Sequence, residues 1–130
     1  MLENPVLESS LNVYGQPLEI CSCKPITGWF RDGTCRTDSS DFGSHTICCE
    51  MTESFLRYSK AQGNDLTTVS ILNDFPGLKA GERWCLCASR WKEAYEDGVA
   101  PLVVLASTEM SALKIVPLEI LEKYALQITN

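Results

Sequence analysis

Apolar and polar residues alternate most clearly in the stretch RWCLC, which runs from Arg83 to Cys87. Side chains alternate across a strand, so we expect Arg83, Cys85 and Cys87 on one face. The other face then carries Trp84 and Leu86, two apolar side chains that suit a protein core. The pattern predicts a short strand that displays two thiols and a guanidinium together.

A helical pattern begins directly after this strand. Trp91, Ala94 and Tyr95 are spaced as i, i+3 and i+4, which places them on one side of a helix. Gly98 follows as a residue that commonly ends helices. The sequence therefore predicts a strand joined to a helix with almost no connecting loop.

Shorter patterns predict the remaining elements. SHTICCEM at residues 44–51 favours a strand because it contains β-branched residues, and Thr52 is expected to cap a helix that extends to about Gln62. The apolar run Leu102 to Ala106 is typical of an interior strand, which we expect beside the alternating strand. Pro117 is expected to open a last helix. Together these patterns predict an α+β fold, with a small mixed sheet of short strands and three or four packed helices.

Length and composition agree with one domain. The 130 residues, 45% of them hydrophobic, are enough for a single compact domain over residues 1–130, with an ordered core from about 12 to 126. The net charge of -6 argues against nonspecific binding to nucleic acid or acidic membranes, which requires a basic surface. The N-terminus is acidic where an export signal would be basic, and no apolar run approaches about 20 residues. We therefore expect a cytoplasmic protein that binds neither membrane nor nucleic acid.

The chain contains seven cysteines. An odd number without an export signal is poor support for a disulfide framework, so we expect mostly reduced thiols or metal thiolates. Cys85 and Cys87 are separated by one residue, which differs from the C-x-x-C spacing of zinc knuckles and thioredoxin motifs. Any single cysteine also has a plain structural interpretation, because a buried thiol behaves as a small hydrophobic group.

His45 is the only histidine. Histidine carries protons near neutral pH and often binds metals, although a lone histidine is more often a hydrogen-bonded structural residue. In a regular strand His45 and Cys48 would point to opposite faces, because their separation is odd. The two residues can share a metal only if the backbone departs from regular strand geometry between them.

A further signal comes from the segments TGWFRDGTC, GSHTICCEMTESFL, GNDL, FPGLKAGERW and RWCLCASRWKEAYEDGVAP. These segments resemble a mainly bacterial family known only as a domain of unknown function, and the resemblance covers roughly Asn12 to Ala125. It implies a single compact domain and no particular activity. The positions that match the family's motifs are Cys21, Cys35, His45, Cys48, Cys85 and Cys87. Relatives often carry a histidine where this chain has Glu109.

Three classes of function remain open. The first is a metal site for zinc or an iron-sulfur centre, because thiolate and imidazole ligands together select these groups. Its expected ligands are Cys48, Cys85, Cys87 and His45, with Cys21 and Cys35 as alternatives.

The second class is a thiol-dependent redox protein or enzyme. Here Arg83 would lower the pKa of Cys85 or Cys87, and His45 would accept or supply a proton. The third class is a non-catalytic module that binds a small molecule or a protein around Trp29, Trp84 and Trp91. For the first two classes we expect the motif cysteines and His45 to converge on one pocket.

Overall fold

The computed structural model describes residues 10–73 and 75–126, and regular structure begins at residue 45. The expectation that the N-terminus lacks an export signal concerns residues 1–11, most of which lie outside the described residues. The elements in chain order are β1 (His45–Glu50), α2 (Glu53–Ala61), β2 (Arg83–Cys87), α3 (Ala88–Glu96), β3 (Leu102–Val103), the 3-10 helices η1 (Leu105–Ser107) and η2 (Met110–Lys114), and α4 (Leu118–Lys123).

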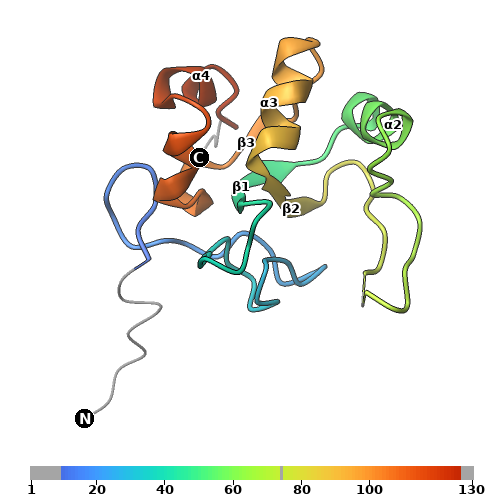
Figure 1. The fold of residues 1–130 in the computed structure, drawn as a ribbon, viewed down its shortest axis with the longest axis horizontal. Helices are drawn as coiled ribbons and strands as arrows, with labels where there is room; N and C mark the ends of the chain where they lie inside the picture. Colours follow the sequence, from blue (N-terminus) through green and yellow to red (C-terminus); the bar gives the residue numbers. More distant parts are fainter. Residues whose placement is uncertain (1–9, 74, 127–130) are drawn as a thin grey trace.

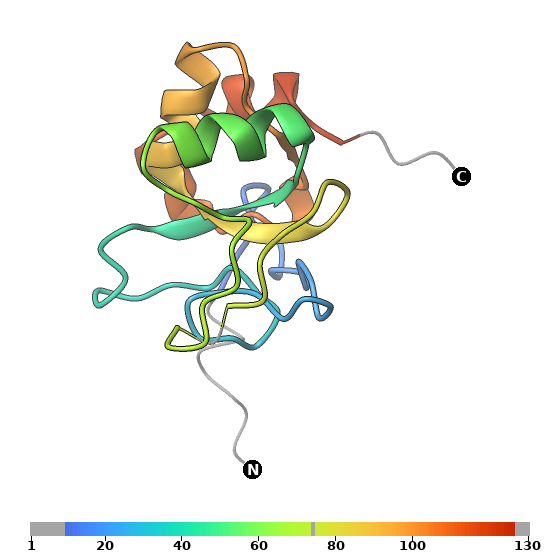
Figure 2. The same ribbon diagram turned by 90° about the vertical axis from the view of Figure 1, so that its right-hand side faces the viewer.

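The elements form three layers. Helices α2, α3 and α4 lie on one side of the three-stranded sheet, and the chain before β1 lies on the other side (Figures 1 and 2). We call this irregular segment, residues 10–43, the loop layer. In the described part of the chain, no helix combines the length and the apolar character needed to cross a membrane. The α+β class is confirmed.

The sheet has the order β2-β1-β3, and its strands pair antiparallel. The predicted interior strand over residues 102–106 is therefore wrong in two respects: only Leu102–Val103 form a strand, and they pair with β1 rather than β2. Val103 is nevertheless interior, because Tyr124 and Leu126 bond its backbone at 2.8 Å and Ala125 adds a parallel bridge. The apolar run indicates that these residues are buried. Part of that burial comes from the C-terminal segment, which bonds to Val103.

The predicted strand–helix pair is confirmed. β2 covers the expected residues and α3 begins at the next one, with Trp91 and Ala94 completely buried. The core between sheet and helices also contains Ile47, Phe55 and Leu121, each no more than 1% exposed. Burial of these apolar side chains is the main stabilising contribution to the helical side of the fold.

The start of α2 provides a local test of the fold. Thr52 has extended backbone angles, and its Oγ1 accepts a hydrogen bond from the Phe55 N–H at 3.2 Å. We expect Thr52→Ala to lower the free energy of unfolding by about 1 kcal/mol, because the N–H loses its cap. Thr52→Ser keeps the acceptor and is the control in urea denaturation. Equal stability of the two variants would mean that this cap contributes nothing.

Candidate functional site

Two cysteines face each other across the sheet. Cys48 of β1 pairs with Cys85 of β2. Their N–H groups bond elsewhere, Cys48 to Thr108 Oγ1 at 3.2 Å and Cys85 to Thr27 Oγ1 at 2.9 Å. The two cysteines are therefore a non-hydrogen-bonded cross-strand pair, the kind in which side chains approach most closely. Both threonines are fully buried and hold the backbone of this pair in place.

Each of these cysteines is bonded to a cysteine of the loop layer. Disulfides join Cys21 to Cys48 and Cys35 to Cys85. The sulfur atoms of Cys21, Cys35 and Cys85 lie within 4.8 Å of one another, although they belong to two different disulfides. All four residues are at most 4% exposed. We call this group, Cys21, Cys35, Cys48 and Cys85, the four-cysteine cluster.

The disulfides correct one expectation from the sequence. Mostly reduced thiols were expected, but four of the seven cysteines are oxidised. The bonded partners are 27 and 50 residues apart, so the spacing of neighbouring cysteines does not indicate which of them pair. The free cysteines are Cys23, Cys49 and Cys87. Burial raises the pKa of the Cys49 thiol well above its ordinary value, so this thiol remains protonated.

A bulge in β1 places His45 on the same face as the cluster. The strand register shifts between His45, which pairs with Cys87, and Ile47, which pairs with Leu86. Thr46 is thus an extra residue, and it reverses the alternation that would have separated His45 from Cys48. The departure from regular strand geometry that a shared face requires is present in the structure.

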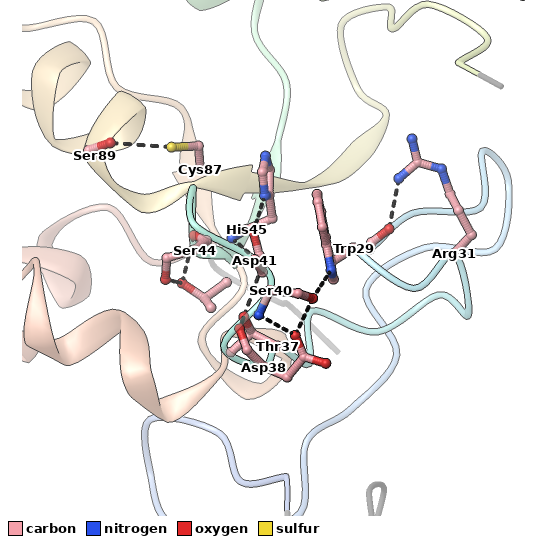
Figure 3. A network of polar contacts seen from close by, with 12 residues as sticks. Trp29, Arg31, Thr37, Asp38, Ser40, Asp41, Ser44, His45, Cys87 and Ser89 are labelled. Carbon is pink, nitrogen blue, oxygen red and sulfur yellow. Dashed lines mark hydrogen bonds and ion pairs between the residues drawn. The ribbon is translucent and has the colours of Figure 1, made fainter. Parts of the chain in front are cut away.

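Asp41 holds His45 in a fixed orientation (Figure 3). Its carboxylate oxygens contact His45 twice, at Nδ1 with 2.7 Å and at the backbone N–H with 2.9 Å. Thr37 Oγ1 donates a further hydrogen bond to Asp41 at 2.9 Å, and the Asp41 side chain is fully buried. A buried carboxylate acceptor keeps the proton on Nδ1, so in neutral His45 the acceptor nitrogen is Nε2.

Trp29 packs against the other side of the imidazole. The two rings stack with centroids 5.7 Å apart and an angle of 13° between their planes. Trp29 Nε1 donates a hydrogen bond to Ser40 Oγ at 3.1 Å (Figure 3). Gly43 leaves room for the ring, because a Cβ there would lie 2.8 Å from His45 Cε1. The His45 side chain is therefore fixed by a carboxylate, an aromatic ring and the adjacent backbone.

A small hollow of about 130 Å³ opens beside these groups. Its lining residues are Gly28, Trp29, Arg31, His45, Trp84 and Cys85. We call it the tryptophan hollow. The Arg31 guanidinium carbon lies 4.9 Å from the centroid of Trp84, and its Nη1 donates to the Gly28 carbonyl at 2.7 Å. Cys85 connects the wall of this hollow to the four-cysteine cluster.

The remaining predicted site residues lie around this centre. Cys87 is partly exposed, and its sulfur is 3.3 Å from Ser89 Oγ, pointing away from His45 in Figure 3. Arg83 lies at the other end of β2 and forms an ion pair with Glu50 at 3.8 Å. Of the expected tryptophans, Trp84 and Trp91 both belong to the core, and Trp84 also lines the hollow together with Trp29.

The grouping of candidate metal ligands differs from the expected one. The sulfur atoms that come together are those of Cys21, Cys35 and Cys85, with Cys48 bonded to Cys21. Cys21 and Cys35, expected as alternatives, are therefore central, whereas Cys87 and His45 stand beside the cluster. Sequence reasoning missed Asp41, whose only signal is a position four residues before the single histidine.

Comparison with known proteins identifies a family but does not indicate a biochemical activity. No curated protein matches the chain. A family model described as "Uncharacterized protein conserved in bacteria (DUF2237)" matches residues 11–125. The match includes the four-cysteine cluster, Asp41, His45 and the whole sheet, so the chain belongs to this family.

Proposed function

We propose that this protein is a thiol–disulfide redox protein whose centre is the four-cysteine cluster. The observation that carries the proposal is the meeting of two disulfides, with sulfur atoms of both within 4.8 Å of one another. Exchange between disulfides requires direct approach of a thiolate to a disulfide sulfur. At this spacing, a thiolate that is released when one disulfide opens can attack the other disulfide.

The free thiol of Cys87 supports the same proposal. It lies two residues after Cys85 in β2, and it is partly exposed, whereas the cluster is buried. We infer that this thiol exchanges partners with Cys85 once the Cys35–Cys85 bond has opened and the Cys87 side chain has turned from Ser89 toward the cluster. The predicted cytoplasmic location also fits, because disulfides in reducing compartments are usually transient and catalytic.

The competing interpretation is that both disulfides are permanent cross-links of the loop layer. The two interpretations differ in reduction potential, since structural disulfides resist the glutathione pool and have potentials below about -300 mV. The experiment equilibrates native protein in glutathione and dithiothreitol buffers of graded potential. Free thiols are then trapped, and labels are counted by mass spectrometry after denaturation.

We expect three labels in the oxidised protein, on Cys23, Cys49 and Cys87, and seven after reduction. The transition should lie above about -300 mV, and reoxidation should restore the original two pairs. Cys23→Ser is a matched control, because it removes an exposed thiol outside the cluster and should leave the midpoint unchanged. A count that stays at three throughout the glutathione range would establish permanent cross-links and reject the redox proposal.

The convergence of thiols favours a second function, metal binding by the reduced cluster. Four thiolates are a common ligand set for structural zinc, and three of the four sulfur atoms here already lie within 4.8 Å of one another. Reduced protein should bind one zinc ion, measured by displacement from a chromophoric chelator. Cys35→Ser should weaken binding strongly and Cys23→Ser should not. No zinc uptake by the reduced wild type would reject this function.

A further inference from the structure

The tryptophan hollow gives access to only one of the two disulfides. Cys85 lines it, and Cys21 and Cys48 do not. The four cysteines are otherwise buried, so an external thiol has to reach the cluster through a gap in its walls. Cys85 is itself only 1% exposed, so a thiol that enters this hollow meets the edge of the Cys35–Cys85 disulfide and not that of Cys21–Cys48.

The dimensions of the hollow restrict the attacking group. The hollow is small, with a volume of about 130 Å³. This space admits a thiol on a short chain, which can enter without the neighbouring backbone that a protein cysteine brings with it. A small-molecule thiol therefore fits the hollow.

The charge of the hollow selects among small thiols. Arg31 is its one guanidinium, and Nη1 is the nitrogen that bonds Gly28, so further donors of the group remain for a ligand. The nearby carboxylates are engaged: Asp41 binds His45 and Thr37, and Asp32 binds Arg36 and Thr34. An Arg fork binds carboxylates in two parallel hydrogen bonds. The walls contributed by Trp29 and Trp84 suit a short apolar stem.

We propose, on the basis of the redox function above, that the tryptophan hollow is a binding site for a small thiol carrying a carboxylate. Arg31 binds the carboxylate, and the thiol sulfur approaches Cys85. His45 accepts the thiol proton at Nε2, because its Nδ1 is held by Asp41. The site would thus recognise the reductant by charge and activate it by proton transfer.

The exchange proceeds in two balanced steps. In the first, the bound thiolate attacks Cys85 Sγ, a mixed disulfide forms, the Cys35–Cys85 bond breaks, and Cys35 leaves as a thiolate. The proton on His45 neutralises one thiolate of the product. In the second step another molecule of the small thiol attacks the mixed disulfide, releasing the oxidised small disulfide and the Cys85 thiol. Two small thiols are oxidised for each protein disulfide reduced.

The test compares 3-mercaptopropionate, 2-mercaptoethanol and cysteamine, which carry negative, neutral and positive groups on similar short chains. Each rate of opening of the native protein is divided by that thiol's rate with 2-hydroxyethyl disulfide, which removes differences in intrinsic reactivity. We expect the corrected rate of mercaptopropionate to exceed that of cysteamine about tenfold or more. Peptide mapping should show that Cys35–Cys85 opens before Cys21–Cys48.

Variants locate the effect. Arg31→Gln should abolish the charge preference, and Arg31→Lys should keep part of it. Arg57→Gln is the matched control, because it removes the same charge from the separate groove beside α2 and should leave the preference intact. His45→Gln should slow all three thiols alike. Thermal melting of each variant verifies that it is folded.

The outcomes separate this inference from the redox proposal. If the disulfides open reversibly but Arg31→Gln and Arg57→Gln show the same preference as the wild type, the hollow is not the thiol site and the redox proposal stands. Earlier opening of Cys21–Cys48 would have the same meaning. If dithiothreitol opens neither disulfide in the native protein, the redox proposal and this inference are both wrong.

Discussion

Reduction of both disulfides, without added metal, is expected to lower the free energy of unfolding by about 4–8 kcal/mol. Each cross-link typically contributes about 2–4 kcal/mol by restricting the unfolded chain, and these close long loops of 27 and 50 residues. The loop layer they attach, residues 10–43, contains isolated bridges but no helix or strand. It therefore depends on the cross-links more than the helical side of the sheet does.

The loss is measured by urea denaturation with and without a phosphine reductant, with hydrogen exchange to locate it. Amides of the loop layer should lose protection first, while those of α3 and β1 keep it longer. Cys23→Ser, treated in the same way, is the control for reductant effects on a free thiol. A change in stability below about 1 kcal/mol on complete reduction would contradict the prediction.

The same experiment bears on the candidate site. Gly28, Trp29 and Arg31 belong to the loop layer, whereas Trp84 and Cys85 belong to β2. The tryptophan hollow therefore exists only while the loop layer is docked on the sheet. Reduction of both disulfides should loosen the hollow, which would limit thiol binding to the oxidised and half-reduced protein.

Trp91→Ala is expected to lower the free energy of unfolding by about 3–5 kcal/mol, the range for removing a large aromatic side chain from a core. Trp91 is completely buried in α3 and stacks on Tyr95 with ring centroids 5.7 Å apart. It also packs edge-on against Tyr124 and donates a hydrogen bond from Nε1 to the Pro101 carbonyl at 3.2 Å. The substitution leaves a cavity where α3 meets the C-terminal segment.

Trp91→Phe is the informative control, because it keeps an aromatic ring and removes the indole N–H. It should cost less than Trp91→Ala and leave the Pro101 carbonyl without this donor. Both variants are measured by urea denaturation of the oxidised protein, so that the disulfides remain intact. A loss below about 1 kcal/mol for Trp91→Ala would mean that the core rearranges to fill the space.

The sequence determined the elements whose causes are local. β2 and the immediate start of α3 follow from a two-residue alternation that changes to helical spacing, and the structure has both. Thr52 caps α2 because its hydroxyl acts within the next three residues. These features depend on neighbours in the chain, so the residue pattern contains the information that specifies them.

Tertiary structure decided the length of the last strand and the chemistry of the cysteines. The apolar run at Leu102 to Ala106 indicates burial alone, whereas the end of β3 depends on the C-terminal segment that bonds to Val103. Disulfide partners 27 and 50 residues apart meet only after the loop layer docks on the sheet. Spacing along the chain cannot specify such pairs, because loop closure allows many alternatives at similar cost.

The candidate site depends on both the sequence and the tertiary structure. The sequence determined which residue types are available, and it placed Cys85 and Cys87 on one strand face. The bulge at Thr46 then moved His45 to that face, and the loop layer brought Asp41, Trp29 and Arg31 beside it. A one-residue shift of register reverses every side chain beyond it, and pairing with β2 selects that register. The side-chain alternation of β2 thus specified the residues that this strand contributes to the site, and the long-range packing of the loop layer specified the others.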